Sequence, residues 1–116
     1  MHFAYIAVTA VTIVANAGAA MADYARAKFV LANSAAVGVP PSWLPALATL
    51  KLAGALGLVV GLAGVPGIGE AAAAGLVLFF IGAVVAHTRA HVFHNIAVPG
   101  AYLLLSAASL AFMITR

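Results

Sequence analysis

Four long apolar stretches, separated by short groups of polar and helix-breaking residues, dominate the pattern along this chain. They cover residues 3–22, 44–64, 70–88 and 96–115. A helix needs about 20 predominantly apolar residues to cross the hydrocarbon core of a bilayer, and each stretch has close to that length. The pattern therefore predicts an all-α membrane protein with four transmembrane helices, and it places the whole chain in one domain.

The connections between these stretches differ in length. The first is long, and its apolar positions between residues 29 and 37 predict a short interfacial helix, which Gly38-Val39-Pro40-Pro41 ends. The pattern leaves open whether this segment lies flat on the membrane or folds over the bundle. The second connection, Val65-Pro66-Gly67-Ile68-Gly69, is a tight turn. The first apolar stretch has no basic segment before it and is longer than the apolar part of a signal peptide, so we expect a retained helix.

Small residues four positions apart recur in three of the four stretches, and this spacing lets helix backbones approach closely in a membrane. The pairs are Gly18 with Ala22, Gly57 with Gly61, and Gly82 with Ala86. We expect all three pairs at helix contacts. Short connections, together with helix faces that carry small residues, predict a compact antiparallel four-helix bundle.

Composition narrows the class of protein. Hydrophobic residues make up 66% of the chain and charged residues 6%, whereas soluble proteins have about 25% charged residues. The absence of cysteine excludes disulfides, thiolate metal sites and dithiol redox chemistry. The net charge is +3, and all basic residues except Lys51 lie at the ends of the stretches, so we interpret it as a topology signal and expect no nucleic-acid partner.

The basic residues also predict an orientation. Arg26, Lys28 and Arg89 fall in the first and third connections, while the opposite side has only Arg116 and the acidic Glu70. Positively charged residues prefer the cytoplasmic side of a membrane. Both termini are therefore expected outside the cytoplasm.

Lys51 is a lone cation inside the second apolar stretch. A lysine at the centre of a membrane helix costs roughly 3 kcal/mol on insertion scales. We therefore expect Lys51 to have either a counter-charge or a functional role. Lys51 lies nine residues after Ser42, or roughly 13 Å along the helix axis. Asn16 has a comparable depth in the first stretch and shares a helix face with Asp23.

Because alternate connections lie on the same side, five polar residues belong to one half of the bilayer. They are Asn16, Asp23, Lys51, His87 and Arg89. If they face inward, they form a polar ligand-binding pocket that opens to the cytoplasmic side. The opposite half, residues 59–65 and 71–78, is apolar and is expected to be closed.

Three of these residues, and also Glu70, have simpler interpretations. Lys51 could extend its ammonium to the interface, form a purely structural ion pair with Asp23, or bind a ligand or proton. Asn16 could hold helices together, Asp23 could mark the end of its helix, and Glu70 could be the N-terminal charge of its helix.

Three histidines, His87, His91 and His94, have the spacing i, i+4, i+7. They would share one face and could bind zinc or copper if the helix continued through them. No carboxylate or cysteine joins them, so we predict no metal site and keep His87 and His91 as weak candidates. His87 could instead titrate near neutral pH beside Lys51 or Arg89.

Two segments resemble the DoxX-like family of small membrane proteins. The stretch from Trp43-Leu44-Pro45 through Lys51-Leu52-Ala53-Gly54 is similar to the second helix of that family. The stretch from Ala71 to Gly82-Ala83-Val84-Val85-Ala86-His87-Thr88-Arg89 resembles its third helix. The resemblance extends over nearly the whole chain, with the most specific parts at the Lys51 helix and at the His87-x-Arg89 ending.

The resemblance implies a multi-pass protein of the bacterial inner membrane. It implies a quinone or another lipophile as ligand, no other cofactor, and an accessory place in a redox-linked membrane complex or a homo-oligomer within the lipid bilayer. The residues leave other functions open. These are a small-solute or proton transporter that acts as an oligomer, a non-catalytic scaffold with its glycine faces toward lipid, and an enzyme that uses Lys51, Asp23 and His87 for acid–base chemistry. We expect a protein that is not catalytic on its own.

Overall fold

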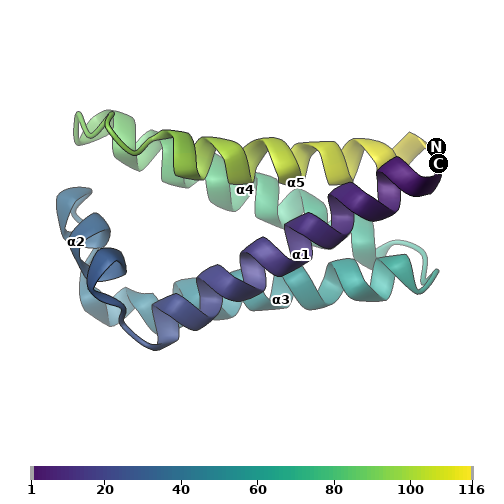
Figure 1. Ribbon diagram of the computed structural model, residues 1–116, viewed down its shortest axis with the longest axis horizontal. Helices are drawn as coiled ribbons and strands as arrows, with labels where there is room; N and C mark the ends of the chain where they lie inside the picture. Colours follow the sequence, from purple (N-terminus) through teal and green to yellow (C-terminus); the bar gives the residue numbers. More distant parts are fainter. Residues whose placement is uncertain (1, 116) are drawn as a thin grey trace.

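The computed structural model describes residues 2–115, which form helices joined by short loops (Figure 1). The elements are α1 (His2–Tyr24), α2 (Lys28–Ala36), the 3₁₀ turn η1 (Pro41–Trp43), α3 (Leu44–Leu62), α4 (Ile68–Arg89) and α5 (Ala97–Thr115). Helices α1, α3, α4 and α5 are long and apolar enough to cross a membrane. The prediction of an all-α protein with four membrane-spanning helices is confirmed, and no helix end differs from the predicted one by more than two residues.

The four long helices form a ring. Helices α1 and α4 face each other across it, and each packs on both α3 and α5. Figure 1 shows the two termini at one end of the bundle, and α2 with the α4–α5 connection at the other. This arrangement is compatible with the predicted antiparallel bundle. We call these ends the terminal end and the α2 end.

Helices α3 and α4 approach most closely near the terminal end. A Cβ atom added to Gly61 would lie 2.7 Å from the Cα atom of Gly69, and one added to Gly57 would lie 2.5 Å from the Cβ atom of Ala72. Backbones can come this close only where side chains are absent or very small. The Gly57 and Gly61 pair is therefore at a helix contact, as its spacing predicted.

The other two small-residue pairs behave differently, and the prediction that they form helix contacts is wrong. No atom lies within 4 Å of a Cβ atom added to Gly18 or Gly82. Both glycines line a cavity together with Ala22 and Ala86. The physical reason is that the helices diverge toward the α2 end, so small residues there leave space between helices.

The hydrophobic core occupies the other part of the bundle. Its fully buried members include Leu58 of α3 and Leu76 of α4, and it extends to Tyr5 and Met113 close to the chain ends. Phe80 lies both in this core and on the cavity wall. The terminal end is therefore packed, whereas the α2 end encloses a cavity.

Replacing Gly61 with alanine should destabilise the protein, because the new methyl group would meet the α4 backbone. Overpacking of this kind costs about 1–3 kcal/mol. Gly75→Ala is the matched control, since Gly75 has open space around it and alanine favours a helix by roughly 1 kcal/mol over glycine. Thermal unfolding in detergent should show a lower Tm for Gly61→Ala alone. Equal melting of the two variants would contradict the close contact between α3 and α4.

Candidate functional site

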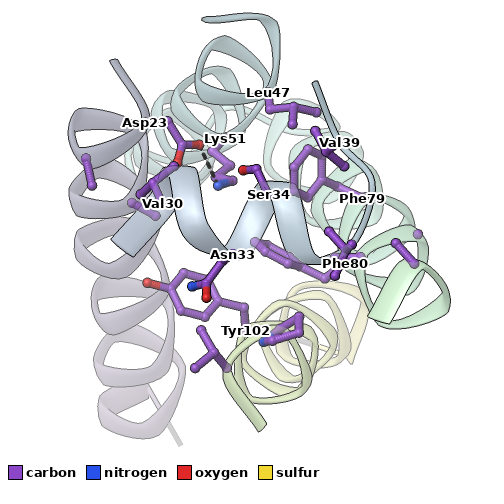
Figure 2. Close-up of a pocket in the computed structure, with 18 of the residues that line it drawn as sticks. Asp23, Val30, Asn33, Ser34, Val39, Leu47, Lys51, Phe79, Phe80 and Tyr102 are labelled. Carbon is purple, nitrogen blue, oxygen red and sulfur yellow. Dashed lines mark hydrogen bonds and ion pairs between the residues drawn. The ribbon is translucent and has the colours of Figure 1, made fainter. Parts of the chain in front are cut away.

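A cavity of about 810 Å³ occupies the α2 end of the bundle (Figure 2). Residues from all five α-helices, from η1 and from the loops line it, and most of them are apolar. Its polar lining residues are Asp23, Asn33, Ser34, Lys51, His87, Asn95 and Tyr102. A concave, mostly apolar space with a few convergent polar groups is the usual form of a small-molecule site.

An ion pair lies in the wall of this cavity. The Lys51 Nζ atom donates a hydrogen bond to Asp23 Oδ2 at 2.7 Å, and the two side chains are 14% and 7% exposed. The same Nζ atom lies 5.5 Å from the centre of the Phe79 ring, within the range of a cation–π interaction. Lys51 therefore stays inside the bundle with its charge neutralised.

The fold brings the two charges together through helix packing. Asp23 lies in the last turn of α1, and Lys51 lies in the first half of α3, against which α1 packs. The Tyr24 hydroxyl and Thr49 Oγ1 form a second contact between these helices at 2.7 Å. Two neighbouring polar contacts thus fix the register of α1 on α3 beside the cavity.

Tyr102 of α5 contributes a functional group that sequence reasoning missed. Its hydroxyl donates to the Ala15 carbonyl oxygen of α1 at 3.1 Å, and its ring lies 5.1 Å from the Phe80 ring. Tyrosine in a membrane protein usually lies at the interface, and Tyr102 follows the start of its helix by only a few residues. The signal available in the sequence therefore favoured an interfacial position over a cavity wall.

Helix α2 covers the cavity instead of lying apart from the bundle. Figure 2 shows Val30, Asn33 and Ser34 on the face of α2 that lines the cavity. Val30 is buried, and Asn95 of the α4–α5 connection donates to the Asn33 Oδ1 atom at 2.9 Å. The predicted short helix thus forms a cover, which answers the question that the sequence left open.

The five residues predicted to converge do not all reach this cavity. Asp23, Lys51 and His87 line it, whereas Asn16 and Arg89 do not. His87 donates through Nδ1 to the Ala83 carbonyl oxygen of its own helix at 2.8 Å, which leaves Nε2 available. Arg89 is exposed at the end of α4, beside a smaller hollow.

The three-histidine face does not form. Helix α4 ends at Arg89, and His91 has a positive φ of 56°, so the helical spacing is lost after His87. Among residues 2–115 no group of three or more potential metal-ligating side chains comes together. Of the two histidines that were weak candidates, His87 therefore lies within α4 and His91 in the loop after it.

Polar residues also occur in the terminal half, at the contact between α1 and α5, which the prediction for residues 59–65 and 71–78 did not cover. Thr9, Thr12, Ser106 and Ser109 are fully buried there, and the Thr12 and Ser109 hydroxyls lie 3.0 Å apart. Asn16 is also buried and donates to the Thr12 carbonyl oxygen at 2.9 Å, while its Oδ1 atom and Thr9 Oγ1 have no hydrogen-bond partner. We call these five residues the polar seam.

The sequence carried a signal for the polar seam. The residues Thr9, Thr12, Asn16 and Asp23 follow one another at spacings of three, four and seven, which puts them on one face of α1. The prediction considered only α3 and α4 in the terminal half, and these helices are indeed apolar there. Polar residues therefore extend beyond the half of the bilayer that was predicted.

Removing one member of the ion pair should destabilise the protein more than removing both charges. Lys51→Met leaves a buried carboxylate without a partner, and breaking a buried pair costs about 3–5 kcal/mol. The double variant Lys51→Met with Asp23→Asn keeps the side-chain shapes and removes both charges, so most of this loss should be recovered. A double-mutant cycle on thermal unfolding measures the coupling. Additive losses would show that the pair contributes nothing.

Comparison with known proteins adds one finding to this geometry. No curated protein and no solved structure matches the chain. A sequence model of the DoxX-like family matches residues 7–109, a range that covers α3 and α4, most of α1 and α5, and every residue of the cavity lining and the ion pair. The chain belongs to the DoxX-like family.

Proposed function

We propose that this DoxX-like protein binds a quinone or another membrane-dissolved lipophile and serves as an accessory subunit of a redox-linked membrane complex. The observation that carries the proposal is the apolar cavity of about 810 Å³ with the Lys51–Asp23 pair in its wall. Ligand pockets measure about 300–1,000 Å³ and combine apolar walls with a few polar groups. The cavity fits this description in both size and chemistry.

The polar groups favour a neutral head with hydrogen-bond acceptors. Lys51 has three N–H donors and uses one on Asp23, so the others can donate to a carbonyl oxygen of the ligand. Because Asp23 already neutralises Lys51, a charged head would enter without a counter-charge from this pair. A quinone is neutral, has two carbonyl oxygens and carries an apolar chain, so the residues present fit such a molecule.

The proposal also includes an orientation. Arg26, Lys28 and Arg89 all lie at the α2 end of the bundle. Positively charged residues favour the cytoplasmic side. We therefore place the cavity in the cytoplasmic half of a bacterial inner membrane, with both termini on the opposite side. The electron-transferring group belongs to a partner in the proposed complex.

The structure gives less support to a scaffold that uses its glycine faces. Such a scaffold needs Gly57 and Gly61 exposed to lipid, yet this face of α3 packs against Gly69 and Ala72 of α4. A ligand site needs Lys51 inside the bundle beside a cavity, which is where it lies. The contrast between these two placements favours ligand binding.

A direct test is mass spectrometry of organic extracts from the gently purified protein. The wild type should retain a quinone or another lipophile, and the variant Lys51→Met with Asp23→Asn should retain much less of it. The double variant is preferred to Lys51→Met alone because it leaves no unpaired buried charge. Identical extracts from the two proteins would argue against a ligand beside the pair.

Filling the cavity should abolish binding without disturbing the fold. Gly82 lines the cavity, so Gly82→Leu adds a side chain at the cavity wall. Gly75→Leu is the control, because Gly75 lies on the same helix but does not line the cavity. Both glycines have open space around them. Trp43 is the only tryptophan and lines the cavity, so its fluorescence can report binding of decylubiquinone. We expect saturable quenching in the wild type and in Gly75→Leu, but not in Gly82→Leu. Equal saturable quenching in both variants would count against this cavity.

Proton or small-solute transport is a second candidate, which the polar seam favours. Its buried atoms Thr9 Oγ1 and Asn16 Oδ1 lack hydrogen-bond partners, and water often satisfies such groups. The seam continues from Asn16 toward the terminal end. If transport occurs, sealed vesicles should show a proton or solute flux that Asp23→Asn reduces. A flux equal to that of empty vesicles would remove this candidate.

A further inference from the structure

A second hollow of about 460 Å³ lies beside the cavity, between the η1 region and the end of α4. Five residues line both spaces: Val37, Val39, Trp43, Gly82 and Ala86. Gly38, Val85, Arg89 and Ala90 line the hollow alone. The two spaces therefore adjoin, and we call the place where they meet, between Val39 and Trp43 on one side and Gly82 and Ala86 on the other, the side opening.

Gly82 contributes no side chain to the side opening, and the space around it is open. No atom lies within 4 Å of a Cβ atom built on Gly82, and Trp43 is 56% exposed. Arg89 is exposed at the outer end of the hollow, at the end of α4. Gly82 precedes Arg89 by seven residues, or roughly 10 Å along the helix. The side opening thus extends from the membrane interface into the hydrocarbon region.

The water-facing end of the cavity is covered, in contrast to its side. Helix α2 lies across that end, and its own residue Val30 is buried on the side that lines the cavity. The hydrogen bond from Asn95 to Asn33 ties α2 to the connection between α4 and α5. A solute from the aqueous phase would have to displace this cover, whereas a molecule dissolved in lipid meets the side opening directly.

We infer that the ligand enters the cavity from the bilayer, through the side opening between η1 and α4. The inference rests on the proposed function and deepens it, because it assigns the ligand to the class of membrane-dissolved lipophiles with a flexible apolar chain. The head passes Gly82 and Ala86 to reach Lys51, and the apolar chain follows it through the side opening into the cavity, so that the hollow is a passage and not part of the binding site. Arg89 lies at the outer end, where it faces the interface.

The test attaches a bulky group in the hollow through a mixed disulfide, which reduction can remove; we call this group the plug. The chain has no cysteine, so Val85→Cys introduces a single thiol in the hollow, away from the cavity lining. Ile81→Cys is the matched control, because Ile81 lies on the same helix, lines neither space and is 44% exposed against 45% for Val85. Each thiol is modified with a bulky methanethiosulfonate reagent in lipid nanodiscs. Quenching of Trp43 by decylubiquinone then gives the association and dissociation rates.

Modified Val85→Cys should bind and release decylubiquinone more slowly, by about tenfold in each direction, with Kd unchanged. Modified Ile81→Cys should keep the rates of the unmodified protein, and reduction of the mixed disulfide should restore those of Val85→Cys. Unchanged rates in modified Val85→Cys would overturn the inference. A weaker Kd with unchanged association would also overturn it, because the plug would then be competing with the ligand inside the cavity.

A second variant tests the alternative route. Asn33→Cys with Asn95→Cys allows a disulfide where the side chains now share a hydrogen bond, and this would fix α2 over the cavity. Asn33 and Asn95 line the cavity, so rates are compared only between the reduced and the cross-linked form of this same double variant. The two forms should bind at equal rates, and a block of entry in the cross-linked form would show that the ligand passes under α2. Failure of the proposed function has a separate signature, since unmodified protein would then show no saturable quenching at all.

Discussion

The ion pair between Asp23 and Lys51 constrains the rest of the structure. A lysine inside hydrocarbon is costly unless a counter-charge meets it, and Asp23 does so at 2.7 Å. That contact fixes where α1 lies on α3, and it holds the end of α1 at the cavity, from which α2 begins. The pairing therefore balances the charge in the cavity wall and, together with the contact between Tyr24 and Thr49, positions the end of α1 from which α2 follows.

Much of the architecture could be predicted from the sequence because it depends on properties that are local to the chain. Four apolar stretches of sufficient length dictate four helices, and the lone cation at Lys51 requires a partner within reach. The parts that were missed depend on how the helices rotate about their axes. Asn16 and Asp23 share a face of α1, but only Asp23 reaches the cavity, and no pattern in one helix determines that difference.

Two further errors have equally specific physical causes. The spacing of His87 and His91 predicts a shared face only while the helix continues, and the positive φ of His91 ends that relation. The glycine pairs show that equal spacing can produce opposite results. Gly57 and Gly61 meet a neighbouring helix, whereas Gly82 with Ala86 meets open space. A small residue permits close approach, but the neighbouring residues decide whether it occurs.

The sizes of the side chains along α4 explain where the bundle opens. Near the terminal end, α4 presents Gly69 and Ala72 to the glycines of α3. Nearer the α2 end it presents the larger buried side chains Leu76, which packs against Gly54 of α3, and Phe80, which reaches the cavity wall. Beyond these two large side chains, the residues of α4 become small again at Gly82 and Ala86. The space between the helices therefore remains open there. The order of side-chain sizes along α4, from small to large and back to small, thus accounts for the tight contact, the cavity and the side opening.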